Sequence, residues 1–215
     1  MNSRKSVFNL GINRYNFHML KDWTGNSKAV IAGIAPSNHS LKDREKDDFY
    51  ATDPKAVDML CDLEKFSSII LEPACGQGHI ADVLKKRGYS VECMDLVDRG
   101  YEGCEICDFL ENSRENADVD IVTNPPYKLA QEFVEKSMQV VGSGHKVAMF
   151  LKLTFLETAK RRELFKKYPP KTVYVASQRI ACWPNGKPTT QSMVCYAWFV
   201  WEKGFSGDTV LKWFN

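Results

Sequence analysis

Apolar and polar residues alternate along most of this 215-residue chain with two different periods. Short β-branched runs indicate strands, whereas apolar residues recurring every three or four positions indicate helices. The pattern predicts strands near 68–72, 90–95, 105–108, 119–123, 146–152 and 172–176, and helices over 78–87, 128–141 and 155–167. Strands that alternate with helices favour an α/β fold, in which helices cover both faces of a mainly parallel sheet.

The two ends of the chain differ from this alternating middle. Residues 1–46 lack sustained periodicity, so we interpret them as an N-terminal arm and linker. Asp53 then has the character of a helix N-cap and Pro54 that of a first helical residue. Near the other end, the apolar run 193–201 predicts a buried strand whose aromatic residues belong to the core. We therefore predict a single domain over residues 47–215.

One tetrapeptide, Asn124-Pro125-Pro126-Tyr127, combines residue types that suit a chemical site. Two consecutive prolines can neither donate to a sheet ladder nor continue a helix, so the preceding strand must end there. The amide oxygen of Asn124 and the carbonyl of Pro125 are acceptors that suit a substrate amino group, and the ring of Tyr127 suits a flat base. An ordinary turn is the alternative interpretation.

A glycine turn upstream, Glu72-Pro73-Ala74-Cys75-Gly76-Gln77-Gly78, joins a predicted strand to a predicted helix. Strand, glycine turn and helix open many nucleotide-binding α/β domains, and we expect Gly76 and Gly78 to let the backbone approach a ligand. This turn lacks the third glycine of the dinucleotide fingerprint. Glu72 would repel a pyrophosphate and attract a cation, which favours a positively charged, phosphate-free cofactor.

Two further acidic residues end predicted strands downstream of the glycine turn. Asp95 follows that turn by roughly 20 residues, the spacing at which an acidic side chain typically binds ribose hydroxyls. Asp108 ends the strand predicted near 105–108 and is expected to accept from an adenine amino group, while Phe109 packs against the ring. These side chains predict a nucleoside site at the carboxyl edge of the sheet.

Taken together, these motifs resemble those of amino-group methyltransferases that use S-adenosylmethionine, above all small DNA N6-adenine methyltransferases of phages and prophages. The matching segments follow the family's order: 48–54, 72–78, 95–100, 108–110, 124–127 and the strand 196–201. The resemblance covers the chain from about Asp47 to its end. It implies a Rossmann-like methyltransferase domain with an antiparallel strand near the C-terminus, S-adenosyl-L-methionine as cofactor, and adenine in DNA as substrate.

The resemblance and the residue chemistry also define the candidate site. Asn124, Pro125, Pro126 and Tyr127 are expected to carry the methyl transfer. The expected cofactor-binding residues are Tyr50, Thr52, Glu72, Pro73, Ala74, Cys75, Gly76, Gly78, Asp95, Leu96, Asp108 and Phe109. Trp183, flanked by Arg179 and Lys187, is a candidate for contact with the target base; packing on the domain edge is the alternative.

The composition of the chain limits the kinds of partner that we expect it to bind. A net charge of +2 provides no strong global field, so any nucleic-acid contact must come from a local patch such as the basic run 160–167, for which a solvated helix face is the alternative. Seven cysteines scattered among predicted strands indicate reduced thiols in a cytoplasmic protein. Cys104 and Cys107 lack a second pair with zinc-ligand spacing, so no metal is expected. No run is long enough for a membrane span.

Several functions remain open at this stage. An RNA amino-group methyltransferase would use the same tetrapeptide, a protein glutamine also presents an amino group, and an inactive nucleic-acid-binding module would keep the fold. No segment of the domain is left over for a separate recognition domain, apart from the predicted loop 179–192 and the N-terminal arm. We therefore expect a short or degenerate recognition sequence, or help from a partner subunit.

Overall fold

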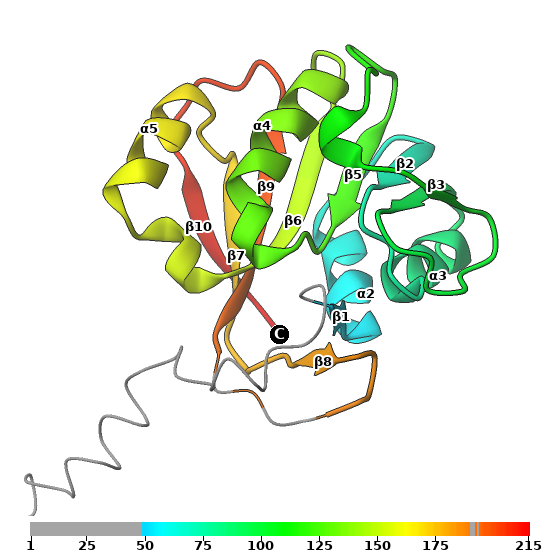
Figure 1. Ribbon diagram of the computed structural model, residues 1–215. Coiled ribbons are helices and arrows are strands. Elements are labelled where there is room, and N and C mark those ends of the chain that lie inside the picture. The colour runs from blue at the N-terminus through cyan, green and yellow to red at the C-terminus, as the bar shows by residue number, and fades with distance from the viewer. Residues whose placement is uncertain (1–48, 190–191, 193) are drawn as a thin grey trace, which may run out of the picture. The chain divides into compact units, whose positions relative to one another are not determined.

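The computed structural model describes residues 49–189, 192 and 194–215, so the predicted arm and linker lie outside the described residues. Their strands form an eight-stranded sheet and a two-stranded sheet (Figure 1). In spatial order the large sheet contains β10 (Val210–Phe214), β7 (Thr172–Ala176), β9 (Tyr196–Glu202), β6 (Lys146–Lys152), β5 (Asp120–Thr123), β2 (Ile69–Glu72), β3 (Ser90–Asp95) and β4 (Cys104–Ile106).

The direction of the strands confirms the predicted fold class. β9 lies between β6 and β7 and is antiparallel to both, whereas the other neighbours in the large sheet are parallel. The strands predicted at 90–95, 146–152 and 172–176 have those bounds. The architecture is thus a mainly parallel α/β sheet with one antiparallel strand near the C-terminus.

The structure differs from the sequence prediction in four of the described strands, including β1 (Tyr50–Thr52), which was not predicted. The strand predicted near 105–108 ends at Ile106, because the Asp108 side chain accepts from the Leu110 N–H and caps the 3₁₀ turn Phe109–Glu111 instead of extending the ladder. The predicted loop 179–192 contains β8 (Cys182–Pro184), which pairs with β1 (Tyr50–Thr52). β10 was not predicted, since its polar flanks and mixed sequence resemble a surface segment.

An N-cap residue or a preceding 3₁₀ turn sets the start of three of the helices. Asp53 caps α2 (Pro54–Leu63) by accepting from the Lys55 N–H at 2.9 Å, as predicted. A 3₁₀ turn precedes each of the last two helices, which therefore begin later than predicted. The remaining helices are α3 (His79–Lys86), α4 (Ala130–Val140) after the turn Tyr127–Leu129, and α5 (Ala159–Lys167) after the turn Leu153–Leu156.

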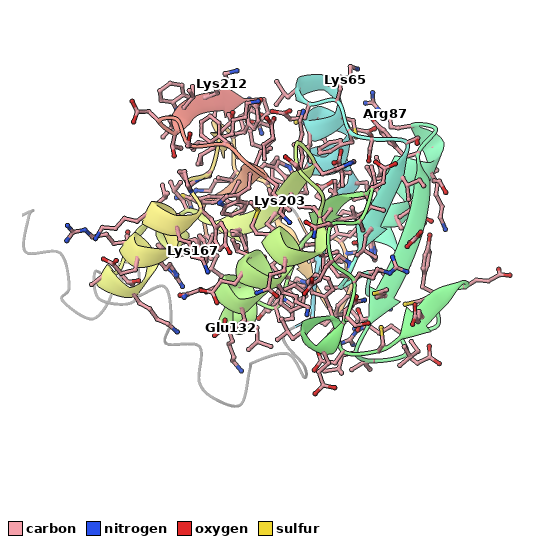
Figure 2. The ribbon with its side chains drawn as sticks, turned by 90° about the horizontal axis from the view of Figure 1, so that it is seen from above. Lys65, Arg87, Glu132, Lys167, Lys203 and Lys212 are labelled. Carbon is pink, nitrogen blue, oxygen red and sulfur yellow. The ribbon has the colours of Figure 1, made fainter. Side chains whose placement is uncertain are left out.

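The core consists of one apolar layer on each face of the large sheet. Because side chains alternate along a strand, β9 sends Phe199 and Trp201 towards the face of α4 and α5, and Trp198 towards the face of α2 and α3. The indole N–H of Trp198 donates to the Ala56 carbonyl at 3.0 Å. The predicted core role of these aromatic residues is thus confirmed. Figure 2 shows Glu132 and Lys167 on one side of the sheet and Lys65, just after α2, on the other.

The order of strands fixes where a ligand is expected. From β2 the chain proceeds outward to β3 and β4, then returns to β5 on the opposite side of β2. Parallel α/β sheets bind ligands at the carboxyl ends of the strands that flank such a reversal. Here those ends carry Glu72 and Asn124, and the small β1–β8 sheet lies beyond the same end of the large sheet (Figure 1).

Candidate active site

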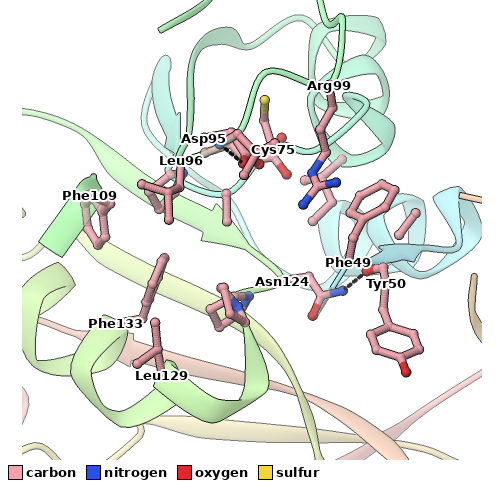
Figure 3. Close-up of a pocket in the computed structure, with 18 of the residues that line it drawn as sticks. Phe49, Tyr50, Cys75, Asp95, Leu96, Arg99, Phe109, Asn124, Leu129 and Phe133 are labelled. Carbon is pink, nitrogen blue, oxygen red and sulfur yellow. Dashed lines mark hydrogen bonds between the residues drawn. The ribbon is translucent and has the colours of Figure 1, made fainter. Parts of the chain in front are cut away.

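A pocket opens at this reversal point and collects most of the predicted residues (Figure 3). The predicted residues that line it are Tyr50, Thr52, Glu72, Pro73, Ala74, Cys75, Asp95, Leu96, Asp108, Phe109, Asn124, Pro125, Pro126 and Tyr127. Gly76 and Gly78 lie in the turn beside it. Arg179, Trp183 and Lys187 do not line it. Segments far apart in the sequence therefore meet in one place, as the strand order requires.

Asn124 presents a buried acceptor to this pocket. Its Nδ2 donates to the Tyr50 carbonyl at 2.7 Å, which fixes the orientation of the amide. Its Oδ1 is buried, and within the described part of the chain it has no hydrogen-bond partner. Such an atom loses the hydrogen bonds of water without replacement, a cost that is typical of positions where a ligand supplies the donor.

The two prolines hold the backbone in place beside Asn124. The Pro126 carbonyl accepts from the Leu129 N–H at 2.9 Å, and this bond starts the 3₁₀ turn that leads into α4. Among the hydrogen bonds of the described residues, none reaches the carbonyl of Pro125. The strand thus ends with one oriented amide oxygen and one neighbouring carbonyl, and the described part of the fold uses neither as an acceptor.

Tyr127 lies in an aromatic group with two other tyrosines. Its ring centre is 6.1 Å from that of Tyr50 and 6.0 Å from that of Tyr196, and the Lys152 ammonium lies 4.7 Å above it. Its hydroxyl lies 3.1 Å from the Cys182 sulfur. Burial raises the pKa of Cys182 to about 11 and that of Tyr127 well above its usual value. The two groups therefore form a neutral pair.

Asp95 joins the glycine turn to the end of β3. One carboxylate oxygen accepts from the Gly76 N–H at 2.8 Å and the other from the Val97 N–H at 2.9 Å. The side chain is only 8% exposed, yet it lines the pocket. Two backbone donors thus fix a carboxylate in the wall of the pocket, where it can accept from ligand hydroxyls.

The two glycines are required for a reason that the sequence did not show. Gly76 and Gly78 have φ values of +56° and +81°, which L side chains rarely adopt. A Cβ atom on Gly76 would also overlap the Phe49 ring, and one on Gly78 would overlap the Tyr101 ring. Two aromatic side chains of the protein itself thus pack closely on these glycines, and close approach by a ligand stays a prediction.

Tyr101 also changes the chemistry at the start of α3. Its hydroxyl donates to Asp82 in the first turn of the helix at 2.8 Å, and its ring covers Gly78, the N-cap. Helix N-termini of nucleotide-binding folds commonly hold phosphate groups. An aromatic ring and a carboxylate occupy that position here, which favours a cofactor without phosphates.

Three more polar atoms are buried at the pocket without a partner among the described residues: Oε2 of Glu72, Oγ1 of Thr52 and Nε of Arg99. Burial raises the pKa of Glu72 well above its usual value. A cationic ligand group nearby would favour the ionised form of this carboxyl. On the other wall Phe109 and Phe133 pack with ring centres 5.2 Å apart, and Figure 3 shows them beside Leu129.

The residues predicted to contact the target base do not line this pocket, and their contact with a base stays a prediction. Trp183 sits in β8 opposite Ala51, and its ring meets the edge of His79 with centres 5.6 Å apart. Arg179 donates to the Ser192 carbonyl at 2.9 Å, and Lys187 is exposed. The geometry thus gives Trp183 and Arg179 packing and tethering contacts, whereas sequence reasoning missed Cys182, which lies next to Trp183 and faces the site.

Neither a metal site nor a membrane helix is found in the part of the chain that the structure describes. No group of three His, Cys, Asp or Glu side chains there is arranged to hold a metal ion. None of the described helices has the length and apolarity needed to cross a bilayer.

Comparison with known proteins identifies the fold. No protein-family model matches the chain, and no curated protein sequence matches it. Solved structures do. A protein from Listeria monocytogenes described as a class I S-adenosylmethionine-dependent methyltransferase superposes with a TM-score of 0.58 at 14% identity, covering 87% of this chain and 71% of that one.

Two further structures have comparable scores. A protein from Vibrio vulnificus YJ016, described as a modification subunit of a type I restriction enzyme, gives a TM-score of 0.53 at 14% identity, covering 85% of this chain and 49% of that one. An O-methyltransferase from Agrobacterium tumefaciens gives 0.53 at 11% identity, covering 73% and 85%. The chain therefore has the Rossmann-like fold of class I methyltransferases.

Proposed function

We propose that this protein transfers a methyl group from S-adenosyl-L-methionine to the N6 amino group of adenine in DNA. The observation that carries the proposal is the Asn124 amide, whose nitrogen is held by Tyr50 and whose oxygen is buried without a partner beside the Pro125 carbonyl. Two acceptors at the end of the strand that flanks the reversal point suit a donor with two hydrogens, which an exocyclic amino group provides.

The pocket fits the cofactor on several independent features. Asp95, fixed by two backbone N–H groups, would accept from the ribose hydroxyls. Phe109 and Leu96 would pack against the adenine ring. Buried Glu72 would offset positive charge, and the Tyr101 ring covers Gly78 at the start of α3, where a phosphate would otherwise bind. A nucleoside that carries a positive charge and lacks phosphates matches this set of contacts.

When bound, S-adenosylmethionine would supply an electrophilic methyl carbon to the lone pair of the substrate nitrogen, with S-adenosylhomocysteine as the leaving group and one amino proton lost to solvent. The lone pair of an exocyclic amino group is delocalised into the ring, which makes the nitrogen a poor nucleophile. Hydrogen bonds to Asn124 Oδ1 and the Pro125 carbonyl would favour a pyramidal nitrogen and strengthen as positive charge develops there.

Tyr127 would stack on a base presented outside its duplex. The tether to Cys182 and the flanking rings of Tyr50 and Tyr196 hold its ring next to Asn124. Because the tyrosine ring is fixed before the base arrives, the entropic cost of ordering it is already met, which is the benefit of positioning.

DNA is the preferred substrate because the motif order resembles that of DNA N6-adenine methyltransferases and because one structural neighbour is described as a restriction-enzyme modification subunit. RNA is the alternative. Incubation with labelled cofactor and adenine-containing duplex DNA, single-stranded DNA, RNA or a glutamine peptide should label DNA and yield N6-methyladenine after nuclease digestion. Label found only in RNA or peptide would overturn the DNA assignment while leaving the methyltransferase assignment intact.

A short or degenerate recognition sequence accompanies this proposal. Each good bidentate contact to a base edge contributes about 1–3 kcal/mol, and a segment as short as 179–192 supplies one or two of them. Sequencing of the methylated adenines should therefore reveal many sequence contexts. A strict site of six or more bases would contradict the expectation.

A further inference from the structure

The charges that line the pocket are unevenly distributed. Its described lining contains three carboxyl groups, those of Glu72, Asp95 and Asp108. His79 also lines it, but burial lowers the pKa of that imidazole and keeps it neutral. Arg99 is therefore the one fixed cation among the described residues that line the pocket.

Arg99 has few partners among the described residues. Its guanidinium lies 4.4 Å above the ring centre of Phe49, and its Nε is buried without a hydrogen-bond partner within the described residues. By contrast, Arg87 pairs with Asp58 and Asp62, and Arg114 pairs with Glu92. A guanidinium carries five N–H donors in a planar fork, so an unpaired one in a pocket is suited to bind a carboxylate.

Phe49 determines where that guanidinium lies. The Phe49 ring rests on Gly76, so Arg99, stacked on the ring, lies over the glycine turn. Phe109 is at the opposite end of the pocket, and Asp95 lies between the two ends (Figure 3). The pocket thus presents an apolar wall, then a carboxylate, then a cation.

The order of these groups along the pocket matches the order of chemical groups along S-adenosylmethionine. Along the proposed cofactor, a flat base is followed by ribose hydroxyls and then by an amino-acid group that ends in a carboxylate. We propose that Arg99 binds this carboxylate and thereby selects cofactors with an intact amino-acid end, while Phe49 holds the guanidinium in place. The inference rests on the proposed function, because it concerns the same pocket.

The alternative is that Arg99 only covers Phe49 and stabilises the glycine turn. The two roles predict that substitution of Arg99 weakens the binding of different sets of ligands. A residue that recognises the carboxylate acts only on ligands that carry one, whereas a residue that shapes the turn acts on every ligand of the pocket. A pair of ligands that differ by one group separates these effects, as in a double-mutant cycle.

The test is calorimetric binding of S-adenosylmethionine and of decarboxylated S-adenosylmethionine, measured without nucleic acid. The wild-type protein should bind the first about 10–100-fold more tightly, in line with one charge-assisted bidentate pair. Arg99→Gln should lose this preference through weaker binding of S-adenosylmethionine, with the decarboxylated form affected less than about threefold. Arg99→Lys should retain part of the preference, because it keeps the charge and loses the fork.

Arg114→Gln is the matched control, since that arginine pairs with Glu92 and does not line the pocket. It should leave both affinities unchanged. Equal weakening of both ligands in Arg99→Gln and Arg99→Lys, or no weakening of either, would overturn the role in carboxylate recognition. If the folded wild-type protein binds neither ligand, the proposed function itself fails, and this inference fails with it.

Discussion

The two halves of the pocket are assembled in different ways. The half around Asp95 comes largely from one continuous stretch, in which β2, the glycine turn, α3 and β3 follow each other and backbone N–H groups fix the carboxylate. The half around Asn124 comes from distant segments: Tyr50 lies before the sheet, whereas Cys182 and Tyr196 lie near its end. One half is specified locally, and the other exists only when the whole domain is folded.

This difference assigns separate tasks to the halves. The local half has its carboxylate satisfied by backbone donors, as suits steady binding of a ligand in every state of a reaction. The distant half contains the buried, unpaired Asn124 oxygen, as suits a group whose hydrogen bond strengthens only during reaction. Substitutions in the first half should therefore change affinity for the cofactor, and those in the second should change turnover.

The largest expected effect is that of Asn124→Ala. Removing one preorganised hydrogen-bond partner of a reacting group lowers turnover by about 10²–10³-fold. Binding of S-adenosylhomocysteine, measured by calorimetry, should stay within about twofold of wild type, because the substitution lies in the other half. Near-normal turnover with saturating cofactor would refute the role of this side chain.

Asp95→Ala should have the opposite effect, lowering affinity for the cofactor more than turnover. Hydrogen bonds to a charged group contribute about 1.5–3 kcal/mol, so we expect affinity for S-adenosylhomocysteine to fall about 10–100-fold. Turnover at saturating cofactor should fall less, because the ribose contacts are similar in the ground and transition states. Asp95→Asn is the matched control for shape. Unchanged affinity in calorimetry would remove Asp95 from the cofactor site.

Cys182→Ala tests whether the tether of Tyr127 contributes to catalysis. It removes the sulfur that lies 3.1 Å from the tyrosine hydroxyl, and we expect a loss of turnover of about 10-fold, equivalent to one hydrogen bond of about 1.4 kcal/mol. Affinity for S-adenosylhomocysteine should not change. An equal loss of affinity would mean that the two halves are coupled.

Ionisation of the Cys182 thiol should have a smaller effect, on the stability of the folded protein at high pH. Burial raises its pKa from 9.0 to about 11 in the folded protein. The unfolded chain therefore loses this proton first, and the contribution of Cys182 to stability is present below pH 9 and is lost as the pH rises towards 11. Alkylation followed by mass spectrometry at pH 8 should modify exposed Cys195 well before Cys182. Faster modification of Cys182 would contradict the raised pKa.

The smallest effect is expected for Trp183→Ala. Since the ring packs on His79 outside the pocket, its loss should lower the melting temperature by a few degrees, corresponding to about 1–2 kcal/mol. Nucleic-acid binding should be unchanged. Weaker binding of nucleic acid at an unchanged melting temperature would instead support the stacking role that the sequence suggested for Trp183.

The same contrast explains what could be predicted from the sequence. Glu72, Asp95 and Asn124 end strands that are visible as short apolar runs, so the edge that they share followed from the strand pattern. Cys182 gave no signal, because its meaning depends on the pairing of β8 with β1. Phe49 and Arg99 were missed for a related reason: their stacking arises from a turn geometry that no periodicity encodes.

The position of β9 has a consequence for how the chain reaches its native state. β7 is synthesised before β9, but in the sheet β9 lies between β7 and β6. β7, and β10 beside it, therefore cannot join the rest of the sheet until residues 196–202 have emerged. Until then the apolar edge of β6 is unpaired, a condition that favours aggregation during folding. Such long-range pairing also slows folding. We therefore expect a nascent chain that stops before Tyr196 to need chaperone protection, although the cofactor-side motifs are already complete.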